Sequence, residues 1–73
     1  MQGQEDLESK AIEAARRYCA GHRWTVARIW VTATVHFSGG HSVWVRATRT
    51  ANGDDLTFRY TVDVQGVGTL TLL

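Results

Sequence analysis

The feature that most constrains the fold is a two-residue alternation within residues 23–37. The odd positions are apolar: Ala27, Ile29, Val31, Ala33, Val35 and Phe37. The even positions are polar or amphipathic: Arg28, Trp30, Thr32, Thr34 and His36. A period of two over this length predicts a β-strand with one buried face. The other strands can be registered against this one, which gives a sheet with two distinguishable faces.

A helical pattern precedes the strand, over about residues 5–20. One apolar stripe collects Leu7, Ala11, Ala14, Ala15 and Tyr18. Because the alanines on this stripe are small, we expect the helix to lie close against the sheet. Gly21 follows, and a glycine in the left-handed conformation is a common way to end a helix.

Two more strands are predicted near residues 41–50 and 55–65. Asn52-Gly53 between them is the strongest signal for a two-residue type I′ turn. Used as the loop, this turn pairs Ala47 with Phe58, Val45 with Tyr60 and Val43 with Val62.

The loop of the first hairpin is chosen by the apolar pattern. A three-residue loop over residues 38–40 pairs Val35 with Val43, whereas a turn at Gly39-Gly40 alone mixes apolar and polar residues on both faces. We choose the three-residue loop because register is set by keeping one face apolar.

The C-terminal residues 69–73 are again β-like, after Gly66 and Gly68 have interrupted the third strand. A turn near residues 65–67 folds them back as a fourth strand, with Val62 opposite Leu70. The alternative is a kinked extension that pairs with another subunit, since glycines also mark bulges. We favour the fourth strand.

These elements predict a single α+β domain over residues 1–73, with an N-terminal helix packed on one face of a curved antiparallel meander of three or four strands. In outline this resembles the helix-on-curved-sheet layout of cystatin-like and NTF2-like domains, and residues 65–68 loosely resemble the inhibitor loop of cystatins. The resemblance is one of shape, and the first cystatin strand has no counterpart. A small closed barrel with an N-terminal helix, in the manner of Sm-like proteins, is the alternative.

Length and composition limit the function classes. With 73 residues the chain is short, and so small a domain is only marginally stable alone. The formal net charge of +1 provides no bulk attraction to nucleic acid or to an anionic membrane. The acidic stretch 1–10 is not typical of a signal peptide, and no segment has the apolar length of a membrane span. We therefore expect a soluble, cytoplasmic protein.

The second face of the predicted sheet carries the most informative side chains. It has no cover from the helix, and it holds Trp30 and Trp44, with Trp24 at its edge. In the predicted register Arg46 and Arg59 are direct cross-strand neighbours, an arrangement that like charges disfavour unless an anion intervenes. The hypothesis we favour is a non-enzymatic interaction module that self-associates or binds a partner protein through Trp24, Trp30, Trp44, Arg46 and Arg59.

Three other interpretations remain open. Single exposed aromatic residues on a threonine-rich face can simply be solvated. A single-stranded nucleic-acid platform would stack bases on the tryptophans and bind phosphates through arginines; its residues are Arg28, Trp30, Trp44, Arg46 and Arg59. A designed or mobile-element (viral) domain without an activity of its own also fits.

No catalytic, metal or cofactor motif stands out. His36, Ser42 and Asp63 share one row of the predicted register, but the histidine does not lie between the serine and the acid as a triad requires. Cys19 and His22 could be half of a metal site, yet no second pair follows at zinc-finger spacing. We therefore expect no enzyme activity, no catalytic residues, no metal site and no cofactor.

Overall fold

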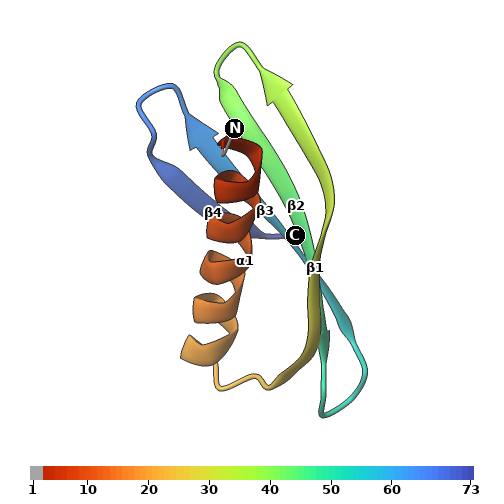
Figure 1. Ribbon diagram of the computed structural model, residues 1–73. Helices are drawn as coiled ribbons and strands as arrows, with labels where there is room; N and C mark the ends of the chain where they lie inside the picture. Colours follow the sequence, from red (N-terminus) through yellow and green to blue (C-terminus); the bar gives the residue numbers. More distant parts are fainter. Residues whose placement is uncertain (1–2) are drawn as a thin grey trace.

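One helix lies across a single antiparallel sheet (Figure 1). The computed structural model describes residues 3–73, with side chains from residue 6 onward. The elements are α1 (Gly3–Gly21), β1 (Val26–Phe37), β2 (Gly40–Arg49), β3 (Asp55–Asp63) and β4 (Gly68–Leu72). The strand order is β1-β2-β3-β4, so the fourth strand belongs to this sheet, as predicted. The sheet is open, which confirms the α+β fold and makes the closed-barrel alternative wrong.

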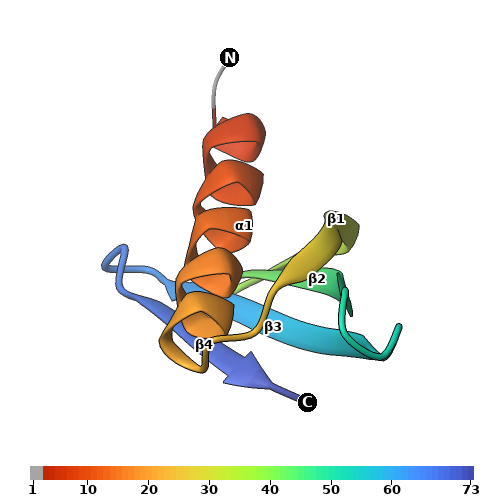
Figure 2. The same ribbon diagram turned by 90° about the horizontal axis from the view of Figure 1, so that it is seen from below.

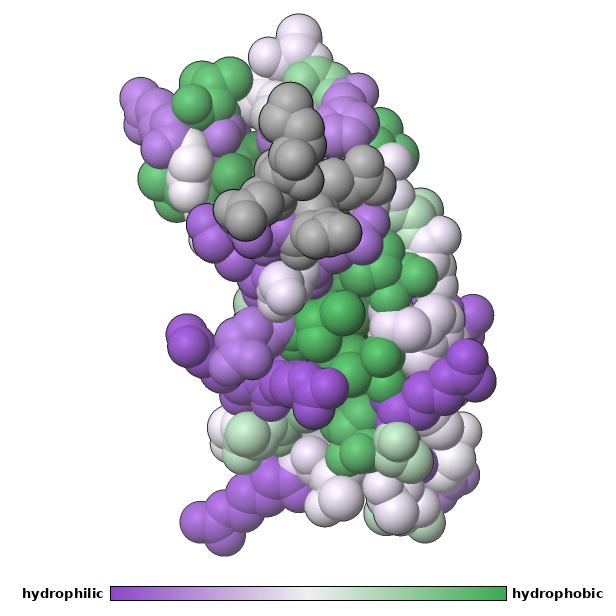
Figure 3. Space-filling model, in the orientation of Figure 1, coloured by the Kyte–Doolittle hydropathy of each residue, from purple (hydrophilic) through white to green (hydrophobic). Residues whose placement is uncertain are grey.

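The helix covers one face of the sheet, and no element of the described part of the chain covers the other (Figure 2). The core lies between them and is built from Leu7, Ala11, Ala15 and Cys19 of α1 and Val43, Val45, Ala47 and Phe58 of β2 and β3. In Figure 3 hydrophobic side chains run down the middle of the molecule, between α1 and β1, with hydrophilic side chains on either side. Ala11 and Ala15 are fully buried, so the small side chains bring the helix close to the sheet, as expected.

The C-terminal end of α1 is a Schellman motif with Arg23 in the left-handed position, at a φ of 60°. The Trp24 amide donates to the Cys19 carbonyl at 2.8 Å, and the Arg23 amide donates to the Ala20 carbonyl at 3.0 Å. Gly21 keeps the helical conformation, so its predicted role as the left-handed stop is wrong. Beyond this motif Trp24 packs back on Tyr18, with 6.1 Å between the ring centroids.

The β2–β3 pairing has the predicted faces but a different register. Val45 lies opposite Phe58 and Val43 opposite Tyr60, so every predicted pair is shifted. The loop is longer than the Asn52-Gly53 turn because the Gly53 amide donates to the Arg49 carbonyl at 2.9 Å and the Arg49 amide to the Asp54 carbonyl at 2.8 Å. In the same way, Val62 lies opposite Gly68 rather than Leu70.

The β1–β2 register differs more, and the predicted three-residue loop is wrong. The turn consists of residues 38–39, and Gly40 already pairs with Phe37 and Asp63. Gly40 has a φ of 140°, and a Cβ added there would lie 1.9 Å from the Val62 carbonyl oxygen. Only glycine fits so close to the neighbouring strand. Gly40 is therefore a residue of the sheet and not of the loop.

Two bulges in β1 absorb the difference in length, one between Val26 and Arg28 and one between Val31 and Ala33. Each bulge adds one residue to β1, so the strand's faces are exchanged beyond it. After the second bulge Thr34 points toward the helix, where its hydroxyl donates to the Glu8 carboxylate at 3.2 Å. Val35 and Phe37 point the other way and are 46% and 47% exposed.

Within the described residues, no helix is both long enough and apolar enough to cross a membrane.

Candidate interaction face

The face of the sheet turned away from α1 is the candidate site, and we call it the outer face. Three of its rows run across β1, β2 and β3: Arg28, Thr48 and Asp55; Trp30, Arg46 and Thr57; Val35, Ser42 and Thr61. The last of these rows continues onto β4 at Thr69, and so does a further row of Ala33, Trp44, Arg59 and Thr71. Phe37 and Gly40 end the face beside the first turn. The face therefore combines aromatic, aliphatic and charged side chains with small hydroxyl residues.

Both tryptophans of the outer face lie beside arginines. Trp30 is directly opposite Arg46, and Trp44 is directly opposite Arg59. The guanidinium of Arg28 lies over the Trp30 ring, with 4.4 Å from its Cζ atom to the ring centroid. This is the distance of a cation–π contact. Both tryptophans are half-buried, although none of the described elements covers this side of the sheet.

Arg46 and Arg59 are not the direct neighbours that the predicted register makes them, because β2 and β3 pair with a different offset. Arg46 is opposite Thr57 instead. Its guanidinium donates to the Asp55 carboxylate at 3.0 Å, and the Thr48 hydroxyl donates to the same carboxylate at 2.8 Å. The predicted like-charge contact is therefore absent, and with it the argument for an anion between these two arginines.

Trp24 lies away from the outer face, so its predicted place at the edge of that face is wrong. It precedes β1 and packs beside the core, stacked on His22 with 4.6 Å between ring centroids. The guanidinium of Arg49 lies over its ring at 4.8 Å. The reason is the bulge after Val26, which interrupts the alternation of β1. Trp24 precedes this bulge, so it does not share the face of Arg28 and Trp30.

The sequence prediction missed the apolar strip of the outer face, formed by Ala33, Val35 and Phe37. These residues were expected in the core, because the alternation continues unbroken across Thr32. Nothing in the pattern marks that position as a bulge. Beneath the strip, Ser42 is only 7% exposed, and its hydroxyl lies 3.2 Å from that of Thr61.

The residues considered for catalysis are not brought together. His36 lies on the helix side of the sheet, opposite His41, whereas Ser42 lies on the outer face opposite Val35. The Asp63 carboxylate accepts hydrogen bonds from the Gln65 and Val67 amides at 2.9 and 3.0 Å, which closes the β3–β4 turn. His36, Ser42 and Asp63 therefore do not share one row of the sheet, and the structure gives no support to a hydrolase interpretation.

Cys19 and His22 do not face a common ligand position either. Cys19 is 1% exposed, and burial raises the pKa of its thiol, an effect that the nearby Arg49 charge partly opposes. His22 is engaged with the Tyr18 and Trp24 rings. Within residues 6–73, whose side chains are described, no three His, Cys, Asp or Glu side chains gather as a metal site.

Compared with known proteins, the chain matches no family model, and no curated protein and no solved structure matches it significantly.

Proposed function

We propose that this protein is a small non-enzymatic interaction module that binds another protein surface through its outer face, with a second copy of the chain as the first partner to test. The observation that carries the proposal is the exposure of Val35 and Phe37, at 46% and 47%, on the side of the sheet that no element of residues 3–73 covers. Together with Trp44 and Trp30 they form one apolar surface across β1 and β2. Contiguous exposed apolar patches of this kind mark interaction sites.

The residue types support a protein partner. Tryptophan and arginine are the side chains most enriched at the energetic centres of protein interfaces. A domain of 73 residues buries a modest share of its surface, so covering the outer face would add to its stability. The gain comes from removing apolar side chains from water.

A second copy is a chemically suitable partner because the outer face carries both signs of charge. Arg28, Arg46 and Arg59 lie on the same face as Asp55 and Asp63. In a two-fold symmetric pair the same patch meets itself, and opposite charges can then face one another. Two sheets packed in this way lie about 10 Å apart.

The test is the solution mass, measured by light scattering over a range of protein concentrations. We expect a dimer that Phe37→Ser and Trp44→Thr each convert to a folded monomer. The loss in free energy of unfolding of the monomer should be about 1 kcal/mol or less, since neither side chain belongs to the core. Val67→Ser is the matched control: it removes a valine that is 56% exposed in the β3–β4 turn, and it should leave the mass unchanged.

A wild-type protein that stays monomeric at every concentration would exclude self-association, and the test would move to a different partner. If the Trp44→Thr variant does not fold, the proposal itself is contradicted, because this result would show that Trp44 belongs to the core.

A single-stranded nucleic acid is the second candidate, favoured by the arginine beside each tryptophan. It is weaker because Arg46 is paired with Asp55 and Arg28 already lies over Trp30. Most affinity for nucleic acid comes from phosphate contacts. The test is fluorescence anisotropy of a labelled single-stranded oligonucleotide at low salt. Arg59→Ala should weaken binding and Arg16→Ala, an exposed helix residue, should not; absence of wild-type binding would exclude this candidate.

A further inference from the structure

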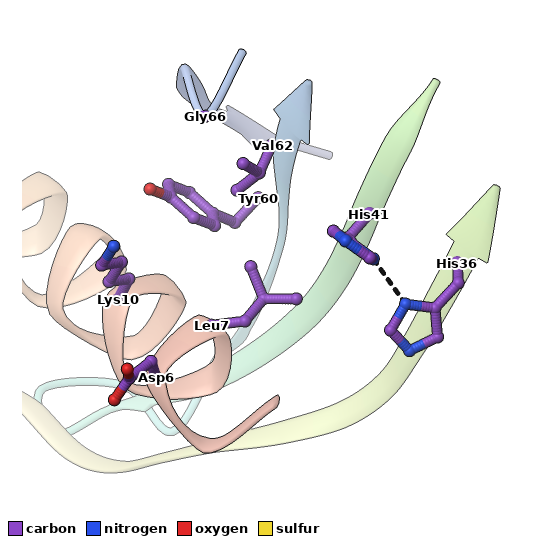
Figure 4. Close-up of a pocket in the computed structure, with 8 residues that line it drawn as sticks. All are labelled: Asp6, Leu7, Lys10, His36, His41, Tyr60, Val62 and Gly66. Atoms are coloured by element: carbon purple, nitrogen blue, oxygen red, sulfur yellow. Dashed lines mark hydrogen bonds between the residues drawn. The ribbon is translucent and has the colours of Figure 1, made fainter. Parts of the chain in front are cut away.

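His36 and His41 face each other on the helix side of the sheet, beside the turn that joins β1 and β2. They are directly opposite residues of the two strands. The Nδ1 atom of one ring makes a hydrogen bond with the Nδ1 atom of the other, and the ring centroids are 4.5 Å apart (Figure 4). Two imidazoles are thus held with the same ring nitrogen of each pointed at the other.

The pair borders a hollow of about 470 Å³ between α1 and the sheet. Leu7 and Lys10 line it from the helix, and Tyr60 and Val62 line it from β3 (Figure 4). His36 is exposed and His41 is half-buried, so solvent and ions reach the pair. This arrangement exists because the bulge before Ala33 turns His36 to the helix side.

We propose that His36 and His41 bind one divalent transition-metal ion through their two Nδ1 atoms. Neutral imidazole is a preferred ligand of zinc, copper and nickel ions. A zinc ion holds such nitrogens at about 2.0–2.1 Å. Rotation of the exposed His36 ring opens the space between the two nitrogens, and opposite positions on antiparallel strands keep both rings within reach.

The proton balance is simple. In the metal-free pair one Nδ1 atom donates its hydrogen to the other. When the ion binds, both Nδ1 atoms offer a lone pair, so that hydrogen moves through solvent to Nε2 of its own ring. Each ring then carries its hydrogen on Nε2, so the number of hydrogens on each ring is unchanged.

The site is a two-ligand site, and water completes the coordination. The described residues hold no third histidine, cysteine or carboxylate gathered with this pair. Asp6 and Lys10 border the same hollow, so the local charge is balanced rather than strongly negative. We therefore expect weaker binding than at structural zinc sites, which use four protein ligands. The site lies on the face opposite the outer face, and its test is independent of the proposed interaction module.

The experiment is titration of the purified protein with zinc chloride, and separately with nickel chloride, by isothermal calorimetry near neutral pH. We expect one ion per chain. His36→Asn and His41→Asn should each weaken binding about tenfold or more, since even outer-sphere changes at metal sites cost that much. His22→Asn, which changes the third histidine of the chain, is the matched control and should bind as the wild type does.

The coordinating atom gives a second readout. Long-range ¹⁵N–¹H spectra of the imidazoles should show Nδ1, and not Nε2, of both rings perturbed by zinc. Circular dichroism checks that His36→Asn, a change at an exposed position, stays folded. The proposal is wrong if the wild type binds neither ion, if both variants bind as tightly as the wild type, or if one ion is bound per two chains with a doubled solution mass.

Discussion

Arg23 occupies the left-handed position that ends α1, with a φ of 60°. For a residue with a Cβ atom this conformation costs about 1–2 kcal/mol, whereas glycine adopts it freely. Trp24 follows as the residue whose amide closes the motif. The nearest glycine, Gly21, lies inside the helix, so it cannot occupy the left-handed position that ends α1.

The Arg23→Gly variant should therefore be more stable than the wild type. We expect the free energy of unfolding to rise by about 1 kcal/mol, less than the full strain because glycine also loses more chain entropy on folding. Urea denaturation followed by circular dichroism measures the change. Arg23→Ala, which keeps a Cβ atom, is the control and should show no such gain; an equal gain would mean that removing the charge, not the strain, is responsible.

At the scale of the elements, the distance between α1 and the sheet is set by alanines. Ala11 and Ala15 are fully buried, and they face a sheet surface that contains Val43, Val45 and Phe58. Because protein interiors are close-packed, a larger side chain at these positions must push the helix outward.

We expect Ala15→Leu to destabilise the protein by about 1–3 kcal/mol, the usual cost of an overpacked core. Thermal denaturation measures it. Ala20→Leu places the same side chain on the same helix at an exposed position, and its unfolding free energy should remain close to that of the wild type. Equal losses in the two variants would show that α1 does not pack through Ala15.

The order and type of the elements could be predicted because their signals are local. The apolar stripe of α1 and the alternation of β1 are each contained in their own segments. Register is different, since it depends on contacts between segments. The close approach of Gly40 to Val62 fixes the first hairpin, and no local pattern reports that contact.

The same distinction explains which parts of the outer face were placed correctly. Trp44, Arg46 and Arg59 lie on the uninterrupted strands β2 and β3, and Trp30 lies between the two bulges of β1. Their faces follow from parity alone. Trp24 and Phe37 lie beyond a bulge, and a single added residue reverses the face that parity assigns.

At the scale of the whole molecule, Cys19 reports on global stability. It is the one cysteine of the chain, and it belongs to the core at 1% exposure. The thiolate is the reactive form, and burial both shields the sulfur and raises the pKa of the thiol. Labelling by a thiol reagent therefore requires the protein to unfold.

We expect the labelling rate of Cys19 to increase with urea in parallel with the unfolded fraction measured by circular dichroism. The pH dependence follows from the same shift. The unfolded chain loses the thiol proton near the usual pKa of 9.0, while the folded protein retains it to higher pH. The free energy of unfolding should therefore fall as the pH rises above that value.

Cys19→Ala provides the control for this pH dependence. The variant should be less stable at neutral pH because it loses core volume, but its stability should fall less steeply in alkaline solution. Rapid labelling of the wild type in the absence of urea would contradict the buried position of the thiol.

The uncrossed strand order also determines how the chain can fold. Each strand pairs with its sequence neighbour, through loops over residues 38–39, 50–54 and 64–67. Such short loops cost little entropy to close, so any of the hairpins can form first, each within about 1–10 μs. An isolated hairpin is only marginally stable in water. Because α1 contacts all four strands, we expect its docking to be the step that joins the hairpins into one cooperative folding unit.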